Sequence, residues 1–217
     1  MWRTIITVFW IVGLISCKNE KRYHDESEMA YFSSQDTTDV IKDILKFQKK
    51  LNDEFKNPET SPLTETQRKS FRRLDFFPPD SAYRVKATFI RTPDALPFLM
   101  ATTTSRRPEY KKYGYAEFKL LGNTYRLNVY QSQQLKIDPE YEDYLFLPFT
   151  DTTNGNLTYG GGRYIDLAIP DGDSIIIDFN KAYNPYCAYN KKYSCPVVPS
   201  DNTLNVNVKA GVKAYKK

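Results

Sequence analysis

The sequence predicts an α+β domain in which a mostly antiparallel β-sheet forms a sandwich or a partly open barrel, with one amphipathic helix and one short helix near the N-terminus. Two observations support this fold class. Short runs of alternating apolar and polar residues end at turn residues, as half-buried strands do. No helices of about 10 to 15 residues separate these runs, although parallel strands would need such crossovers. An antiparallel barrel without helical cover is the alternative fold.

The first helix is predicted by apolar residues that recur at spacings of three and four between Val40 and Phe55. Aspartates stand at the start of this pattern and lysines follow, so the helix should begin near Thr38 and end before Pro58. An apolar stripe of this kind usually faces a protein core. We therefore expect the helix to pack against the sheet.

The second helix is predicted by a capping box, in which the side chains of Thr64 and Gln67 satisfy each other's backbone amides. We expect this helix to carry Phe71 and Leu74 inward. It should stop at Pro78–Pro79, because proline cannot continue a helix.

The strands follow the second helix. They are predicted at 83–89, 96–103, 116–121, 124–131, 144–149, 163–169, 174–179 and 204–208. Gly122–Asn123 suits a type II′ turn between two of them, and Pro170–Asp173 predicts a second hairpin. The run 144–149 is nearly all apolar and indicates a buried strand whose ladder Pro148 should end.

The first 37 residues predict the cellular location of the protein. Arg3, an apolar run and the order Leu14-Ile15-Ser16-Cys17 are typical of a bacterial lipoprotein signal, with residues 1–16 removed and Cys17 acylated. The run is shorter than the roughly 20 residues of a membrane-spanning helix. Residues 17–37 are polar and predict a flexible tether, and residues 38–217 predict a single α+β domain. An ordinary cleaved signal or an uncleaved anchor is the alternative.

The expected location is the bacterial cell envelope, with the protein attached to the membrane by its lipid. The residues directly after Cys17 lack an aspartate, which favours the outer membrane. The formal charge of the chain is +5, and basic residues alternate with acidic ones. The sequence has no basic stripe that would indicate a nucleic-acid partner.

His24 is the single histidine and lies in the tether. Its position excludes a Ser-His-Asp or Cys-His catalytic arrangement and a histidine-ligated metal from the folded part, and we expect no cofactor. Cys187 and Cys195 should form a disulfide in an oxidising compartment. The nine-residue loop that they close would be worth about 2.5 kcal/mol. A metal site is the alternative, but zinc requires about four nitrogen or sulfur ligands.

The candidate site lies between Thr158 and Cys195, where glycines, tyrosines, asparagines and charged residues are dense. The candidate ligand-binding residues are Tyr159, Gly161, Arg163, Tyr164, Asp166, Asp178, Asn180, Tyr183, Asn184, Tyr186 and Tyr189. The glycines either form a turn that passes close to other backbone or leave room for a ligand. The phenols and amides either satisfy their own loop or bind a sugar or another small polar molecule.

Arg163 leaves two possibilities open. It forms an internal ion pair with a carboxylate, or it faces a polar pocket together with Asp166 and Asp178. The hairpin predicted at 163–179 would bring Gly160–Tyr164 next to Asp178–Asn190, with Arg163 near the end of the second strand.

Several long motifs resemble the bacterial family called domain of unknown function 1684. They are Leu145–Phe149 with Asp151-Thr152, Thr158–Tyr164, Asp178–Asn190, Cys195-Pro196 and Ala210-Gly211. The resemblance extends from about Pro62 to the C-terminus and identifies the chain as a short, lipoprotein-type member. It implies an exported or membrane-anchored protein without a known activity. It also implies that the segments around Gly161 and Asn180 belong to one site.

Three functions are consistent with these residues. The first is a lipid-anchored binding module for a small polar or saccharide ligand. The second is a carboxylate-dependent hydrolase that uses Asp166 and Asp178, which would need the two carboxyl groups about 5 to 9 Å apart in a cleft. The third is a structural envelope lipoprotein that binds another protein.

Overall fold

The structure is a computed structural model and describes residues 34–216. The predicted signal segment 1–16, the lipidation site Cys17 and the tether up to residue 33 lie outside the described residues. Within residues 34–216, none of the helices combines the length and the apolar character that crossing a bilayer requires.

The long helix α1 spans Ser34–Lys56 and is amphipathic, as predicted, but it begins within the segment expected to be a tether. Ile44, Leu51 and Phe55 are buried on its inner face. Ion pairs such as Lys49–Asp53, with 2.6 Å between Nζ and Oδ2, lie on its exposed face. The helix therefore gains its stability mainly by packing its apolar face on the rest of the domain.

The short helix α2 spans Glu65–Ser70 and has the predicted capping box between Thr64 and Gln67. It ends well before Pro78, because Phe71 already has an extended backbone. Leu74 is buried as expected, but it reaches the core from an extended segment, where its N–H donates to the side chain of Asn52 at 2.7 Å. Leu74 therefore reaches the core through the packing of the extended segment after α2, and not because the helix is longer.

The strands form one eight-stranded sheet. They are β1 (Arg84–Arg91), β2 (Pro97–Leu99), β3 (Glu109–Leu120), β4 (Asn123–Ser132), β5 (Tyr144–Asp151), β6 (Arg163–Ala168), β7 (Ser174–Asp178) and β8 (Thr203–Leu204). The main path runs β6-β5-β4-β3-β1-β7, with β2 added to β3 and β8 added to β5. Apart from the parallel β5–β8 contact, all strand pairs are antiparallel. The fold is the predicted α+β class with a curled, half-barrel sheet.

The pairing of the two end strands of this path, β6 and β7, differs from the prediction. β6 and β7 were expected to pair as a hairpin, but β6 pairs with β5 and β7 pairs with β1. The five residues between them, 169–173, span the gap between the two ends of the sheet. Because so short a link joins the ends, the sheet must curl until they approach each other.

Two turn predictions are also corrected. In the β3–β4 hairpin the turn residues are Leu121 and Gly122, with φ values of 48° and 86°. Positive φ at both positions is typical of a type I′ turn, not of the expected type II′ turn. Pro148 does not end its strand, because β5 continues to Asp151. The ladder between β5 and β4 consists of Tyr130 and Phe146, so Pro148 interrupts no pairing on that side.

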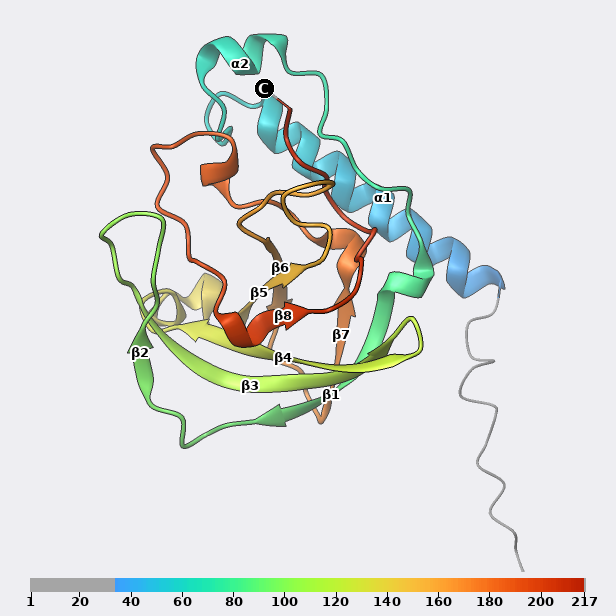
Figure 1. Cartoon of the computed structure of the whole chain (residues 1–217), viewed down its shortest axis with the longest axis vertical. Helices are drawn as coiled ribbons and strands as arrows, with labels where there is room; N and C mark the ends of the chain where they lie inside the picture. The colour runs from blue at the N-terminus through green and yellow to red at the C-terminus, as the bar shows by residue number, and fades with distance from the viewer. Residues whose placement is uncertain (1–33, 217) are drawn as a thin grey trace, which may run out of the picture. The chain divides into compact units, whose positions relative to one another are not determined.

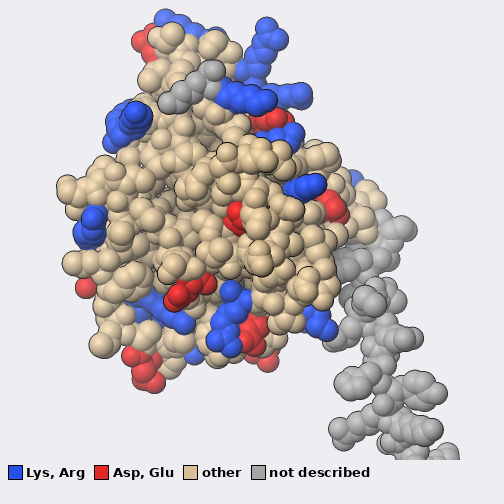
Figure 2. Space-filling view, in the orientation of Figure 1, with Lys and Arg blue, Asp and Glu red and all other residues tan. Residues whose placement is uncertain are grey.

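Figure 1 shows α1 on the opposite side of the domain from the long β3–β4 hairpin. The main core fills the curl of the sheet and includes Ala87, Leu127, Leu145 and Ile177. A second apolar cluster packs under α1, where Phe55 and Leu74 meet Val212 of the C-terminal segment. On the face drawn in Figure 2, positive and negative side chains are interspersed around a mostly uncharged centre.

Candidate functional site

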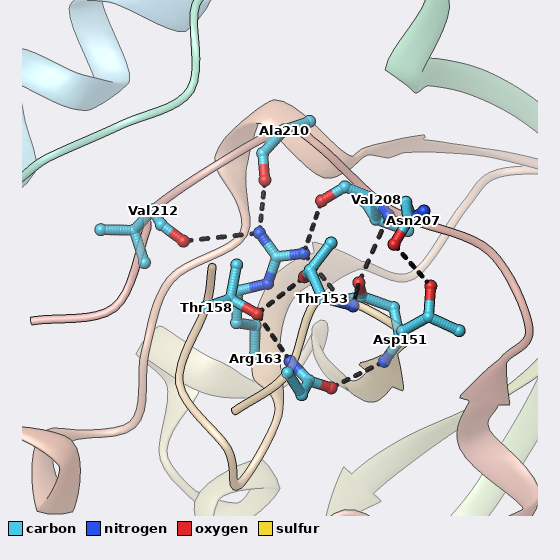
Figure 3. A network of polar contacts seen from close by, with 10 residues as sticks. Asp151, Thr153, Thr158, Arg163, Asn207, Val208, Ala210 and Val212 are labelled. Atoms are coloured by element: carbon cyan, nitrogen blue, oxygen red, sulfur yellow. Dashed lines mark hydrogen bonds and ion pairs between the residues drawn. The ribbon is translucent and has the colours of Figure 1, made fainter. Parts of the chain in front are cut away.

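Arg163 is completely buried and belongs to the interior of the domain. Its Nη2 lies 2.8 Å from Oδ2 of Asp151, whose side chain is also fully buried. The same guanidinium donates to the backbone carbonyl oxygens of Val208, Ala210 and Val212, and Figure 3 shows these groups around it. Arg163 therefore holds the C-terminal segment against β5 and β6. Its ion-pair partner is Asp151 and not Asp178, which pairs with Arg84.

The glycines before Arg163 are explained by close packing. Gly162 has a φ of 86°, and a Cβ there would lie 2.6 Å from the carbonyl oxygen of Phe149. A Cβ on Gly161 would lie 2.6 Å from the ring of Tyr159. The contact at Gly162 is with backbone and excludes a side chain there unless the backbone moves, whereas a turn of the Tyr159 ring would make room at Gly161. Of the two possibilities for this motif, the close backbone turn is therefore the one found.

Asp178 and Asn180 also have structural partners. Asp178 is buried, and its Oδ2 lies 3.1 Å from Nη1 of Arg84. Asn180 donates through Nδ2 to the carbonyl oxygen of Asp80 at 2.7 Å. Both side chains hold the start of β1 to the end of β7.

Asn184 and Tyr189 are buried in the loop that follows. Nδ2 of Asn184 donates to the carbonyl oxygen of Lys213 at 3.0 Å. The ring of Tyr189 packs edge-on against Phe55 of α1, with 4.7 Å between ring centroids. These two residues therefore tie the loop to the C-terminal segment and to α1, and neither of them lines the pocket.

A pocket of about 420 Å³ lies between α1, the outer face of the β5–β6 pair and the loop 185–196. From the candidate residues it includes Tyr164, Asp166, Tyr183 and Tyr186, together with Cys195. It does not include Tyr159, Gly161, Arg163, Asp178, Asn180, Asn184 or Tyr189. Its volume lies within the roughly 300 to 1,000 Å³ of small-molecule sites.

Strand alternation explains why Arg163 and Asp166 are separated. Successive side chains of a strand point to opposite faces, so Arg163 and Ile165 face the core while Tyr164 and Asp166 face the pocket. In the β5–β6 ladder Asp166 stands opposite Phe146, and Tyr144 lies two residues earlier on the same face. The aromatic and acidic side chains therefore share one face of this strand pair.

Asp166 is the central polar group of the pocket. The hydroxyls of Tyr144 and Tyr183 both donate to its Oδ1, at 2.8 and 2.6 Å. Its side chain is exposed, so solvent or a ligand reaches it, although aromatic rings surround it. The surrounding rings partly desolvate the carboxyl group and raise the pKa of Asp166, whereas the two phenol hydrogen bonds lower it. Burial near Asp166 raises the pKa of Tyr183 and of Tyr144, so both phenols stay protonated as donors.

The raised pKa has a consequence for the role of Asp166. An acid whose pKa is higher in the folded state than in the unfolded chain stabilises the fold less when it is ionised. Asp166 therefore differs from Asp151, whose negative charge is paired with the positive charge of the buried Arg163. A titratable group with a perturbed pKa in a pocket is typical of a functional site.

The segments around Gly161 and Asn180 meet as expected, but at a different point. Tyr164 and Tyr183 form an isolated antiparallel bridge, with N–H to O distances of 2.9 and 3.0 Å. Their rings are nearly perpendicular, with 5.9 Å between centroids. The contact thus forms the wall of the pocket, and it does not require the predicted hairpin.

Most residues of the pocket wall were not predicted from the sequence. Helix α1 contributes Phe47, Lys50, Leu51 and Glu54, and the strands contribute Tyr110, Tyr144 and Phe146. The loop adds Pro185, Tyr193, Ser194 and Pro196. Two signals were available. The helical residues recur at spacings of three and four, and Tyr144 and Phe146 have the same alternation as Tyr164 and Asp166.

Cys187 and Cys195 are free thiols in the structure and are not joined as a disulfide, but they lie side by side. The N–H of Cys187 donates to Sγ of Cys195 at 3.1 Å. Hydrogen bonding to Cys195 lowers the pKa of Cys187 to about 6, which favours the reactive thiolate. Their pairing in an oxidising compartment stays a prediction. No group of three or more potential metal-binding side chains occurs within residues 34–216.

Fold and pocket together define a class: a curled antiparallel sheet whose outer face, covered by one helix, carries an aromatic pocket. The chain belongs to the family described as protein of unknown function (DUF1684), whose model matches residues 69–213. This confirms the resemblance found in the sequence motifs.

One similar solved structure is the solution NMR structure of an uncharacterized protein of Haloarcula marismortui. It is 32% identical and has a TM-score of 0.65, and the match covers 83% of this chain and 97% of the other. No curated protein shows significant similarity to the chain.

Proposed function

We propose that the chain is a lipid-anchored envelope protein whose domain binds a small polar or saccharide ligand in the aromatic pocket. The observation that supports ligand binding is the exposed carboxylate of Asp166, held by two phenols inside a pocket of about 420 Å³. Ligand sites usually combine apolar and aromatic walls with a few oriented polar groups. This pocket has that composition.

The geometry favours binding over hydrolysis by Asp166 and Asp178. A glycosidase-type mechanism needs two carboxyl groups on opposite sides of the scissile bond in one cleft. Asp178 does not line the pocket and is held by Arg84 in a separate network. The carboxylate pair considered in the sequence analysis is thus not brought together.

Calorimetric titration of the full chain with monosaccharides and small polar molecules tests the binding function. We expect at least one of them to bind. Tyr186→Ala should weaken that binding about tenfold, because it removes an exposed ring of the pocket wall. Tyr115→Ala is the matched control, because Tyr115 is a partly exposed tyrosine outside the pocket. No binding, or equal losses in both variants, would contradict the proposal.

The anchor is tested separately, because it depends on residues 14–17 of the sequence. Acylation needs the thiol of Cys17, so Cys17→Ala should accumulate as an uncleaved precursor and fail to incorporate a fatty-acid probe. The measurement is probe labelling together with the mass of the N-terminal peptide. Equal labelling of wild type and variant would show that Cys17 is not the lipidation site.

A further inference from the structure

The charges on the pocket wall favour a cationic ligand. The charged residues that line the pocket are Lys50, Glu54 and Asp166. Lys50 and Glu54 are one helical turn apart and form an ion pair, with 3.8 Å between Nζ and Oε1. Among residues 34–216, no basic side chain forms an ion pair with Asp166. One net negative charge therefore remains inside the pocket.

The rings around this charge have the arrangement of a cage. Eight of the sixteen lining residues are aromatic. Phe146 and Tyr164 meet edge-on with 4.8 Å between centroids, and Tyr186 meets Tyr193 at 5.2 Å. Walls built from rings at steep angles present several π faces and edges to one guest. A cation near such faces is attracted by the negative potential of the rings.

Several hydrogen-bond acceptors of the pocket wall already have partners, which favours a cation with few N–H donors. Oδ1 of Asp166 already accepts two phenol hydrogen bonds, and the hydroxyl of Tyr164 donates to the carbonyl oxygen of Pro196. Ser194 is bonded to Thr102 and Thr104. A primary ammonium has three donors to satisfy. A methylated ammonium has fewer donors or none, and its methyl groups pack on rings.

We propose that the ligand group recognised by this pocket is a methylated ammonium, placed between the aromatic rings with its charge opposite Asp166. This inference rests on the proposed binding function and specifies the chemistry of its ligand. Asp166 supplies the countercharge, the hydroxyls of Tyr144 and Tyr183 fix its orientation, and the surrounding rings pack against the methyl groups.

The probe is choline chloride, and its neutral carbon isostere 3,3-dimethyl-1-butanol is the control ligand. Both are titrated calorimetrically into the full chain at constant ionic strength. We expect choline to bind at least about tenfold more tightly, because the two molecules have the same shape and differ in charge. Equal affinities would overturn the cation inference, because shape alone would then account for binding.

The matched variants are Asp166→Asn and Glu117→Gln. Asparagine keeps the shape of the side chain and an oxygen that accepts from the two phenols, but it removes the charge. We expect Asp166→Asn to weaken choline binding at least about tenfold. Glu117 is an exposed residue outside the pocket that pairs with Arg126, so Glu117→Gln removes the same charge without touching the site. Equal effects of the two variants would contradict a specific role for Asp166.

A pH titration of the wild type, with Asp166→Asn as its control, gives a second measurement. The pKa of Asp166 is raised above its ordinary 3.8 by desolvation, so the carboxylate should lose its charge at a higher pH than an ordinary aspartate. Its titratable and charged neighbours in the pocket are Tyr144 and Tyr183 on the sheet side, and Lys50 and Glu54 on α1. The phenols keep their protons on the acid side, so choline affinity should fall as the pH falls towards the pKa of Asp166, and this fall should be smaller in Asp166→Asn. Affinity that stays constant down to pH 3, or a fall of the same size in Asp166→Asn, would contradict the role of its charge.

The ligand comparison also separates the two proposals. Binding of a monosaccharide that Tyr186→Ala weakens, without binding of choline, would overturn the cation inference and leave the pocket as a binding site. Absence of binding by choline, the alcohol and the monosaccharides would overturn both.

Discussion

Replacing Arg163 by alanine should lower the free energy of unfolding by about 3 to 5 kcal/mol, because it leaves the fully buried carboxylate of Asp151 without its countercharge. The substitution also removes the donor for the carbonyl oxygens of Val208 and Ala210. Natural domains have an unfolding free energy of about 5 to 15 kcal/mol, so the loss is a large part of the total. Urea denaturation of the full chain measures it.

The matched control is Arg126→Ala. Arg126 pairs with Glu117 at 2.6 Å, but both side chains are exposed, so we expect a loss of at most about 1 kcal/mol. If Arg163→Ala cost no more than this control and abolished ligand binding, Arg163 would be a ligand residue and its structural role would be wrong.

The second large effect is expected for Gly211→Ala. Gly211 has a φ of 76°, and an added Cβ would lie 2.6 Å from the carbonyl oxygen of Ala182 and 2.8 Å from that of Phe179. The strained backbone and the overlap each cost about 1 to 3 kcal/mol, so we expect a total loss of about 2 to 6 kcal/mol. The C-terminal segment would have to move away from the end of β7.

Gly122→Ala separates these two contributions. Gly122 has a similar φ of 86°, but no atom lies within 4 Å of a Cβ at that position. Its loss should therefore reflect backbone strain alone, about 1 to 2 kcal/mol. Equal denaturation midpoints for the two variants would show that the close carbonyl contacts of Gly211 contribute nothing.

Local features of the fold were predictable from the sequence. The capping box of α2 depends on residues three apart, and the β3–β4 hairpin depends on one turn with a glycine. The partners of β6 and β7 were not predictable in this way. A turn signal between two strands does not distinguish a hairpin from a link between the two ends of a curled sheet. That choice depends on contacts with β5 and β1, which lie elsewhere in the chain.

The candidate site was predicted in part for the same physical reason. Gly162 and Arg163 are conspicuous because backbone packs closely at the glycine and a charge is buried at the arginine, and both are requirements of the fold. The alternation between Arg163 and Asp166 could have shown that they face opposite sides of β6. No local pattern, however, relates Tyr164 and Asp166 to residues of α1, because only the tertiary fold brings the helix over that face.

The central claim of this account is that the ligand site is the pocket around Asp166 and not the glycine segment at Arg163. Two-dimensional NMR of the isotope-labelled full chain, titrated with choline chloride, tests it most directly. We expect saturable shifts in the amide signals of Asp166, Tyr183 and residues 47–54 of α1, with those of Gly160–Gly162 moving less. Shifts confined to Gly160–Arg163 would contradict the claim, and the absence of any saturable shift would contradict the cation inference.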